Sequence, residues 1–302
     1  MNKMQIKIGN LILKNPVMSA SGTFGYAEEF KDFMDLKMLG AVISKTITLK
    51  PRTGNPMPRI CETAGGMLNS IGLENKGVDD FLDTKLPYLV RLGIPIIVSI
   101  SGDSIDEFIE LLKILDKEKD VDAVELNISC PNIKGKGLIA QDKDSTYTLL
   151  KRIRKFTNKA LITKLSPNVT DISRIAKAAE AGGSDALSLI NTVLGMSIDI
   201  NTKRPMLGNI VGGLSGPCIK PIALRMVYEV SKNTRLPIIG IGGIMDWKDA
   251  IEFFIAGATS IQVGTANFID PATAEKVILG IEEYLKKNKI KDIKDIVGSM
   301  SI

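Results

Sequence analysis

A cysteine lies between two amide side chains where a hydrophobic segment ends. Ala123-Val-Glu-Leu-Asn-Ile-Ser-Cys-Pro-Asn132 begins with β-forming residues and ends with a proline, which predicts a buried strand over 123–129. Asn127, Cys130 and Asn132 then lie at or just past the carboxyl end of this strand, the end where parallel α/β proteins bind ligands. By residue type alone a buried cysteine is more often a small apolar core residue. Because the chain contains no histidine, however, we interpret Cys130 as a candidate base or nucleophile.

Two lysines stand inside segments that otherwise have the pattern of buried strands. Lys45 lies in an expected strand over 41–47, and Lys164 lies in another over 161–165. An ammonium group is costly to bury unless it meets an anion or a polar ligand. The two lysines therefore indicate a ligand that carries negative charge, although each charge could instead reach solvent at the end of its strand.

Further amides stand near other expected strand ends. Asn69 lies in Leu68-Asn-Ser-Ile-Gly-Leu73, and Asn191 is followed by Thr192. Amides both donate and accept hydrogen bonds, so together with the two amides named above they suit a planar ligand with alternating N–H and C=O groups. Singly, each of them is more often a turn former.

Glycine-rich segments end or follow the last two expected strands. They are Pro237-Ile-Ile-Gly-Ile-Gly-Gly-Ile244 and Ser260-Ile-Gln-Val-Gly-Thr-Ala266. Glycines at these places let backbone N–H groups approach a phosphate closely, and barrel proteins frequently bind phosphate after strands seven and eight. The pattern favours a phosphate site, with tight turns or close packing as the alternative.

Strand-like segments alternate with amphipathic helical patterns along the whole chain. We expect strands at 16–20, 41–47, 95–100, 123–129, 161–165, 186–191, 237–241 and 260–263, and helices at 28–36, 78–92, 104–116, 145–157, 171–181, 217–232, 247–256 and 272–287. Strands this apolar argue for a parallel sheet covered on both faces. Eight such units, without a GxGxxG motif after the first strand, favour a closed (β/α)8 TIM barrel over an open doubly wound sheet. No linker divides the chain, so we expect one α/β barrel domain over 1–302.

Local signals add detail to this barrel. A hairpin is expected over 4–13, with Gly9-Asn10 as its turn, and it could plug the amino-terminal end of the barrel. Three long connections follow strands two, four and six and suggest lids or binding loops on the carboxyl face; they are 48–76, 130–143 and 192–216. Helix ends are predicted by Ser104 with Glu107 as a capping box, by Asp171 as an N-cap, and by glycines at 182, 183 and 257 as C-termini.

The composition argues against several classes of function. Lysine and arginine are spread along the chain despite a net charge of +5, and no recognition motif accompanies them, so we expect no nucleic-acid partner. There is no signal-peptide pattern and no apolar run of roughly 18 residues, so we expect a cytoplasmic protein without a membrane span. Cys61, Cys130 and Cys218 have no CxxC spacing and indicate neither a disulfide framework nor a metal site.

Several motifs in the same order resemble the dihydroorotate dehydrogenase family of flavin enzymes. They are Ser44-Lys-Thr46, Asn69-Ser-Ile-Gly-Leu73, Glu125-Leu-Asn-Ile-Ser-Cys-Pro-Asn132, Ser166-Pro-Asn-Val-Thr-Asp171, Ile190-Asn-Thr192 and Ile241-Gly-Gly-Ile244. The resemblance runs essentially end to end. It implies an FMN-containing (β/α)8 barrel that oxidises (S)-dihydroorotate to orotate in pyrimidine biosynthesis.

The resemblance also implies roles for individual residues. Cys130 would be the base that removes the C5 proton while C6 delivers a hydride to N5 of the flavin. Lys45 would touch both substrate and flavin, and Lys164 would stabilise negative charge at the N1/O2 edge of the flavin. The orotate would be held by Asn69, Asn127, Asn191 and Thr192, with the backbone of Ser70, Ile71, Gly72 and Leu73. FMN would be surrounded by Ser21, Thr46, Ser99, Asn127, Ile190, Gly216, Gly242, Gly243, Gly264 and Thr265, the last four at its phosphate.

Other features of the resemblance indicate a subclass. Ser99 departs from the family pattern, since many relatives have the longer asparagine there. Cysteine rather than serine at position 130, and the lack of an amphipathic amino-terminal extension, argue against the quinone-linked membrane class. The motifs that begin at Asn69 and Ser166 are more similar to the heteromeric, NAD-linked form than to the fumarate-reducing homodimer.

The NAD-linked form implies a particular assembly. A homodimer of this chain would stand within a heterotetramer, and a partner electron-transfer subunit with FAD and a [2Fe-2S] cluster would pass electrons to NAD⁺. Two other interpretations stay open. One is an FMN barrel like that of dihydropyrimidine dehydrogenase, which reduces uracil or thymine, and the other is a non-catalytic phosphate-binding barrel in which Cys130 only packs.

Overall fold

The structure is a computed structural model, and it describes residues 3–129 and 138–301. Cys130 and Asn132 therefore lie outside the described residues. The hydrophobic core forms one large cluster that includes Met4 near one end of the chain and Ile296 near the other, so both ends of the described chain belong to the same packed unit.

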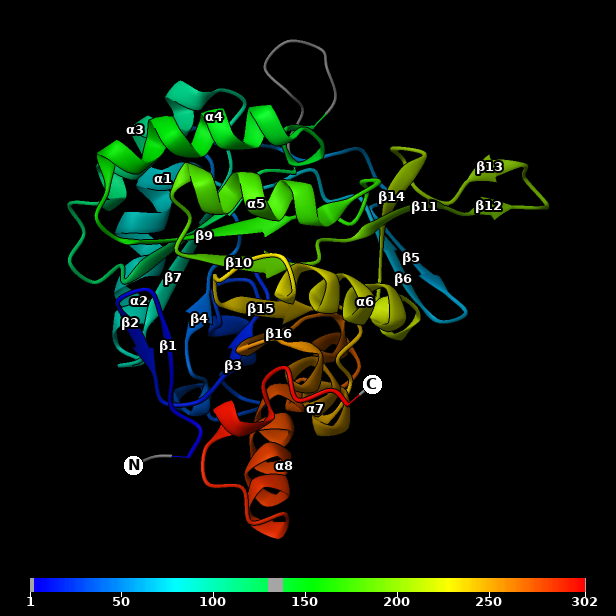
Figure 1. The fold of residues 1–302 in the computed structure, drawn as a ribbon. Coiled ribbons are helices and arrows are strands. Elements are labelled where there is room, and N and C mark those ends of the chain that lie inside the picture. Colours follow the sequence, from blue (N-terminus) through cyan, green and yellow to red (C-terminus); the bar gives the residue numbers. More distant parts are fainter. Residues whose placement is uncertain (1–2, 130–137, 302) are drawn as a thin grey trace.

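Eight parallel strands form a (β/α)8 TIM barrel, which confirms the predicted fold (Figure 1). The strands follow one another around the sheet in chain order, with β3 between β16 and the gap to β4. Their bounds are β3 Val17–Ser19, β4 Val42–Ile43, β7 Ile96–Ile100, β8 Ala123–Asn127, β9 Ala160–Leu165, β10 Ala186–Leu189, β15 Ile238–Ile241 and β16 Ser260–Val263. Most of their side chains are buried, as expected of strands covered on both faces.

A serine side chain helps to close the barrel between β3 and β4. Met18 and Ala41 form an isolated parallel bridge there. Beside it the Ser19 hydroxyl accepts from Ile43 N at 2.9 Å and donates to Ile43 O at 3.3 Å. The Ser19 hydroxyl thus takes the place of backbone hydrogen bonds that β3 and the short strand β4 do not form with each other.

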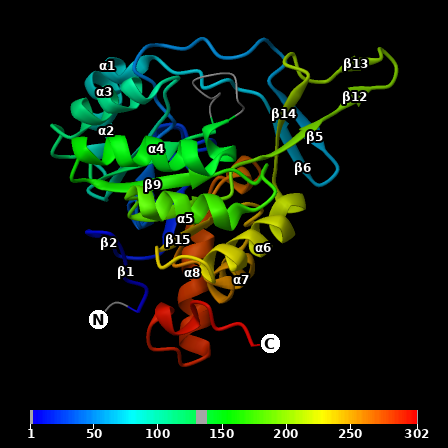
Figure 2. The same cartoon turned by 45° about the horizontal axis from the view of Figure 1, so that its top comes forward.

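Helices cover the outside of the barrel, and consecutive helices from α3 to α8 are neighbours (Figures 1 and 2). Their bounds are α3 Ile105–Leu115, α4 Lys143–Ile153, α5 Ile172–Gly182, α6 Lys220–Ser231, α7 Trp247–Ala256 and α8 Thr273–Lys287. Asp171 caps α5 as predicted, and Gly183 and Gly257 take left-handed backbone conformations at helix C-termini. Only half of the predicted capping box forms at α3, because Ser104 accepts from Glu107 N while the Glu107 carboxylate accepts from Asp103 N instead.

Two predicted elements were wrong in extent or type. The expected helix over 28–36 forms only short 3-10 turns, Glu28–Phe30 and Leu36–Met38, because the Asp35 carboxylate accepts from Lys37 N and starts a new turn. The expected strand 41–47 is reduced to β4, because Lys45 N donates to Gly25 O and takes the chain out of the ladder.

The helix expected over 78–92 forms in three parts. A π-type stretch, Phe81–Lys85, separates α1 Gly77–Asp80 from α2 Leu86–Val90. Pro87 has no backbone N–H to donate to the preceding turn, and this is where the regular α pattern changes.

The predicted amino-terminal hairpin is confirmed as β1 Ile6–Ile8 and β2 Leu11–Leu13. Its turn residue Gly9 is at the amino ends of two barrel strands, since a Cβ on Gly9 would contact Ala160 and Asp185 at 3.4 and 3.3 Å. Ile8 and Leu13 are fully buried. The hairpin therefore packs against the end of the barrel opposite to the strand carboxyl ends.

Two of the long connections fold into a sheet that sequence analysis missed. The first contains β5 Ile60–Thr63 and β6 Gly66–Asn69, and the second contains β11 Val193–Met196 and β14 Val211–Ser215. They pair in the antiparallel order β11-β14-β6-β5. A further pair, β12 Ile198–Asp199 and β13 Arg204–Pro205, projects away from the barrel (Figure 2).

Candidate active site

A cavity of about 870 Å³ lies at the carboxyl ends of the barrel strands. This volume is in the range of cofactor and substrate pockets. Segments that directly follow seven of the eight barrel strands contribute to its wall, and the antiparallel sheet contributes the rest. Of the site residues predicted from sequence, those that line it are Ser21, Lys45, Thr46, Asn69, Ser70, Ile71, Gly72, Leu73, Asn127, Lys164, Ile190, Asn191, Thr192, Gly216, Gly242, Gly243, Gly264 and Thr265. Ser99 does not line it, and Cys130 lies outside the described residues.

One end of the cavity, here called the glycine end, is formed by the backbone of Gly216, Gly242, Gly243 and Gly264. The first three have φ values of +99°, +124° and +72°, which favour glycine. Gly243 also packs tightly, since a Cβ there would lie 2.7 Å from Lys220 Cβ. Gly264 is less tightly packed, since an added Cβ there would make an ordinary van der Waals contact with Ala20 Cβ at 3.6 Å. Backbone amides at such a loop can approach an anion closely.

A cation lies directly behind the glycine end. The Lys220 ammonium donates to Asp249 at 2.6 Å and to Glu252 at 2.9 Å. Burial alone would lower the pKa of Lys220, but these hydrogen bonds and charges outweigh it and raise the pKa above its ordinary value. Asp249 in turn accepts from Met245 N and Asp246 N, so the pair braces the loop that follows β15.

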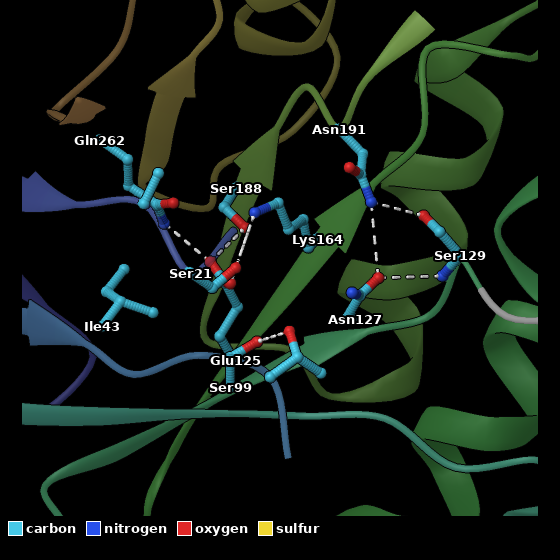
Figure 3. Close-up of polar contacts among 12 residues, drawn as sticks. Ser21, Ile43, Ser99, Glu125, Asn127, Ser129, Lys164, Ser188, Asn191 and Gln262 are labelled. Atoms are coloured by element: carbon cyan, nitrogen blue, oxygen red, sulfur yellow. Dashed lines mark hydrogen bonds and ion pairs between the residues drawn. The ribbon is translucent and has the colours of Figure 1, made fainter. Parts of the chain in front are cut away.

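The other end of the cavity, here called the amide end, is formed by side chains (Figure 3). Asn191 Nδ2 donates to Ser129 Oγ at 2.9 Å and is 3.5 Å from Asn127 Oδ1, which also accepts from Ser129 N. Asn69 joins them from β6, where its Nδ2 donates to Gly213 O. The three amides come from a barrel strand, a barrel loop and the antiparallel sheet, and they line one cavity. Asn132, the fourth predicted amide, lies outside the described residues.

The loop between Asn69 and Glu74 holds an unusual backbone beside these amides. Gly72 and Leu73 both have positive φ, at +75° and +56°. A Cβ on Gly72 would lie 2.6 Å from Asn55, whose amide donates to Ser70 Oγ at 2.8 Å. The left-handed turn lets the loop lie against Asn55 and line the cavity.

The two predicted lysines have different surroundings. Lys164 is 6% exposed, and its Nζ lies 3.2 Å from Ser21 Oγ and 3.6 Å from Glu125 Oε1. Within residues 3–129 and 138–301, the Lys45 ammonium has no hydrogen bond or ion pair. Lys45 is therefore available to a ligand in the cavity.

Ser99 lies behind the cavity wall. Its hydroxyl is fully buried and shares a 2.9 Å hydrogen bond with Thr46 Oγ1, and Thr46 lines the cavity. A contact between Ser99 and a ligand would thus pass through Thr46.

Sequence analysis assigned no role to several polar residues of the site. Ser129, Ser166 and Asn168 line the cavity, and Asn168 links two loops by donating to Thr192 O and accepting from Leu194 N. Glu125, Ser188 and Gln262 are buried beneath it. Their positions in the sequence could have revealed them, since each is a polar residue in or directly after an apolar strand.

The described residues form neither a metal-ion cluster nor a membrane-spanning helix. Residues 3–129 and 138–301 contain no group of three or more His, Cys, Asp or Glu placed to hold a metal ion. In the same ranges no helix has both the length and the apolar character needed to cross a membrane.

Comparison with known proteins gives a consistent result. Residues 3–285 match the family model described as dihydroorotate dehydrogenase. The chain is 52% identical to the dihydroorotate dehydrogenase B (NAD(+)) catalytic subunit of Geotalea daltonii, over 99% of this chain and 98% of that protein. It is 50% identical to the protein of the same name from Geobacter sulfurreducens, with the same coverage. The one from Thermoanaerobacter sp. is 49% identical over 99% of both chains.

Proposed function

Because the chain belongs to the dihydroorotate dehydrogenase family, we propose that it is the FMN-binding catalytic subunit of an NAD-linked enzyme that oxidises (S)-dihydroorotate to orotate in de novo pyrimidine biosynthesis. One observation carries the proposal most directly. A single cavity joins a glycine end suited to a phosphate with an amide end and two lysines suited to a planar, anionic ring. The match to the family model over residues 3–285 and the relatives that cover 99% of the chain support the proposal.

The residues that line the cavity fit FMN. At the glycine end, Gly242, Gly243 and Gly264 present backbone to the cavity without side chains, and Thr265 lies beside them. Bound FMN would supply the acceptor for a hydride. The cavity residues proposed to hold it are Ser21, Lys45, Thr46, Asn127, Lys164, Ile190, Gly216, Gly242, Gly243, Gly264 and Thr265.

Dihydroorotate would bind at the amide end. Its ring offers alternating N–H and C=O groups, which pair with amides such as Asn69, Asn127 and Asn191. Its carboxylate suits the ammonium of Lys45 and the hydroxyl of Thr192, which both line the cavity. The loop that contains Ser70, Ile71, Gly72 and Leu73 would cover the bound dihydroorotate ring.

Cys130 is proposed as the base that removes the C5 proton. Ser129, the last residue before 130–137, lines the cavity and accepts a hydrogen bond from Asn191. The described chain therefore reaches the cavity wall one residue before the cysteine. A thiolate is a suitable base in a chain without histidine.

An absorbance spectrum of the purified chain tests this proposal. We expect the yellow spectrum of bound FMN, which bleaches when dihydroorotate is added without oxygen and does not bleach with dihydrouracil. Bleaching by dihydrouracil but not by dihydroorotate would instead favour a dihydropyrimidine dehydrogenase-like activity. A colourless protein that binds no added FMN would overturn the proposal.

A partner subunit is part of the proposal. The printed names of the relatives include "catalytic subunit", which implies another subunit in those proteins. Three cysteines are fewer than the four that usually hold a [2Fe-2S] cluster, so we assign that cluster and FAD to the partner and propose two of each subunit in a heterotetramer. Exposed apolar residues on β11, on β12 and just after β12 offer surface for subunit contacts; they include Leu194, Ile198 and Ile200.

Reduction of NAD⁺ tests the division of labour. The chain alone, with FMN and dihydroorotate, is expected to reduce a dye but to reduce NAD⁺ slowly. Full NAD⁺ reduction by the chain alone would contradict the need for a partner. Given the chemistry, we expect the complex to work in the cytoplasm.

A further inference from the structure

A buried carboxylate lies beneath the cavity, and the proposed reaction does not use it. Glu125, on β8, is fully buried inside the barrel (Figure 3). Its Oε2 accepts from Gln262 Nε2 at 2.7 Å and from Ser188 Oγ at 3.0 Å. Its Oε1 has no hydrogen-bond partner and lies 3.6 Å from the Lys164 ammonium.

These contacts suit a carboxylate that accepts hydrogen bonds. Gln262 Nε2 can only donate, and both hydrogen bonds end at Oε2 of Glu125, which accepts them. Strands β8, β10 and β16 each contribute one member of the cluster, so the contact between Glu125 and Gln262 crosses the barrel interior. A charge held this way is costly unless an opposite charge is close, and Lys164 supplies that charge.

Lys164 depends on the same contact. It is 6% exposed, and its ammonium donates a hydrogen bond to the uncharged Ser21. The register places it beside Asn127 on β8 and Ser188 on β10, which are also uncharged. Other charged groups that line the described cavity are Glu29, Lys45 and Glu74, and none of them forms an ion pair with Lys164. Without Glu125 the buried ammonium would lose its counter-charge.

We propose that Glu125 is a positioning residue, a counter-ion built into the barrel interior that holds the Lys164 ammonium at the cavity wall. The inference rests on the proposed function, because it concerns the electrostatics at the FMN site. A positive charge at the edge of a flavin favours its reduction. Glu125 would therefore raise the midpoint potential of bound FMN indirectly, through Lys164.

The test is the midpoint potential of bound FMN in three variants, measured by anaerobic titration against a reference dye. Lys164→Met removes the positive charge and is expected to lower the potential. Glu125→Gln is expected to lower it by at least half as much, because the ammonium loses its counter-ion and moves from its place at the cavity wall. The double variant is expected to show no further drop beyond Lys164→Met, since the carboxylate acts only through the lysine.

Each other outcome contradicts the inference. A higher potential in Glu125→Gln would mean that the carboxylate merely opposes the charge of Lys164. An unchanged potential, or an additive drop in the double variant, would mean that Glu125 does not act through Lys164.

Two further variants guard against a general loss of structure. Ser188→Ala removes one hydrogen bond to Glu125 but keeps its charge, so it should leave the potential close to that of the unchanged chain. A drop as large as that of Glu125→Gln would assign the effect to disruption of the cluster. If Glu125→Gln does not fold, Glu125→Asp retains the charge farther from Lys164 and should give an intermediate drop, whereas an unchanged potential would contradict the inference. A chain that binds no FMN would contradict the proposed function itself.

Discussion

The glycine end and the amide end of the cavity are built from different parts of the polypeptide. At the glycine end, backbone atoms of Gly242, Gly243 and Gly264 form the wall, and two residues take backbone conformations that favour glycine. At the amide end, side chains of Asn127, Ser129 and Asn191 bind one another and the wall is polar. A side chain added at the glycine end should therefore impair ligand binding there, whereas at the amide end the loss of a polar side chain should impair it. The two ends should therefore separate cofactor binding from turnover.

The largest effect is expected from Cys130→Ala, a change at the residue that follows Ser129 of the amide end in sequence. FMN should stay bound, but its reduction by dihydroorotate should slow roughly 10²–10⁴-fold, the usual contribution of positioned proton transfer. Stopped-flow absorbance measures the rate. Cys130→Ser is the matched control, and its rate of FMN reduction should lie between the rates of the unchanged chain and of Cys130→Ala. Near-normal reduction in Cys130→Ala would remove the base assignment.

At the glycine end, Gly243→Val should weaken FMN binding. Its Cβ would stand 2.7 Å from Lys220 Cβ and 2.8 Å from Lys220 N, so the loop must move. Overpacking typically costs about 1–3 kcal/mol, which corresponds to roughly tenfold to a hundredfold in the Kd of FMN. Fluorescence titration of the apoprotein checks this value.

Gly93→Ala is the control for this change, because it also has positive φ but an added Cβ meets nothing within 4 Å. It should lose some stability and keep its FMN affinity. Equal losses of FMN affinity in both variants would show that the glycine end is not a specific site.

Asn191→Ala should raise the KM for dihydroorotate and leave the FMN content unchanged. The change removes an amide that donates to Ser129 and is expected to pair with the ring. A lost hydrogen bond is worth about 0.5–1.5 kcal/mol, so kcat/KM should fall roughly tenfold at most. Asn288→Ala, whose amide donates to Tyr284 O away from the cavity, should have no effect. Loss of FMN in Asn191→Ala would break the distinction between the two ends.

The smallest effect is expected from Lys220→Met, which removes the ion pairs behind the glycine end. FMN should bind a few-fold more weakly, while the KM for dihydroorotate stays the same. Because the pKa of Lys220 is raised in the folded protein, its pairs are complete below the ordinary lysine value of 10.5 and are lost only as the pH rises beyond it. The difference in FMN affinity between the unchanged chain and Lys220→Met should therefore be constant from about pH 6 to pH 9.

The barrel could be predicted from the sequence because buried parallel strands leave a strong apolar pattern. The antiparallel sheet could not, because strands such as β6 and β14 are short and rich in glycine, and several apolar side chains on it are exposed. The false helix over 28–36 has apolar residues at helical spacing, which did not reveal that Asp35 would bind the backbone instead.

The candidate site divides in the same way. Glycines after the last two strands and amides after others were visible in the sequence because their positions follow strand ends. The ion pair of Glu125 and Lys164 was not, because it depends on which strands face each other across the barrel. Polar residues within apolar strands were the available sign.

A crystal structure of the chain with FMN and orotate tests the central claim most directly. We expect the FMN phosphate within hydrogen-bond distance of the backbone at Gly243 and Gly264, and the orotate ring against the amides of Asn69, Asn127 and Asn191. A phosphate at the amide end, or an orotate ring bound away from these three amides, would contradict the account.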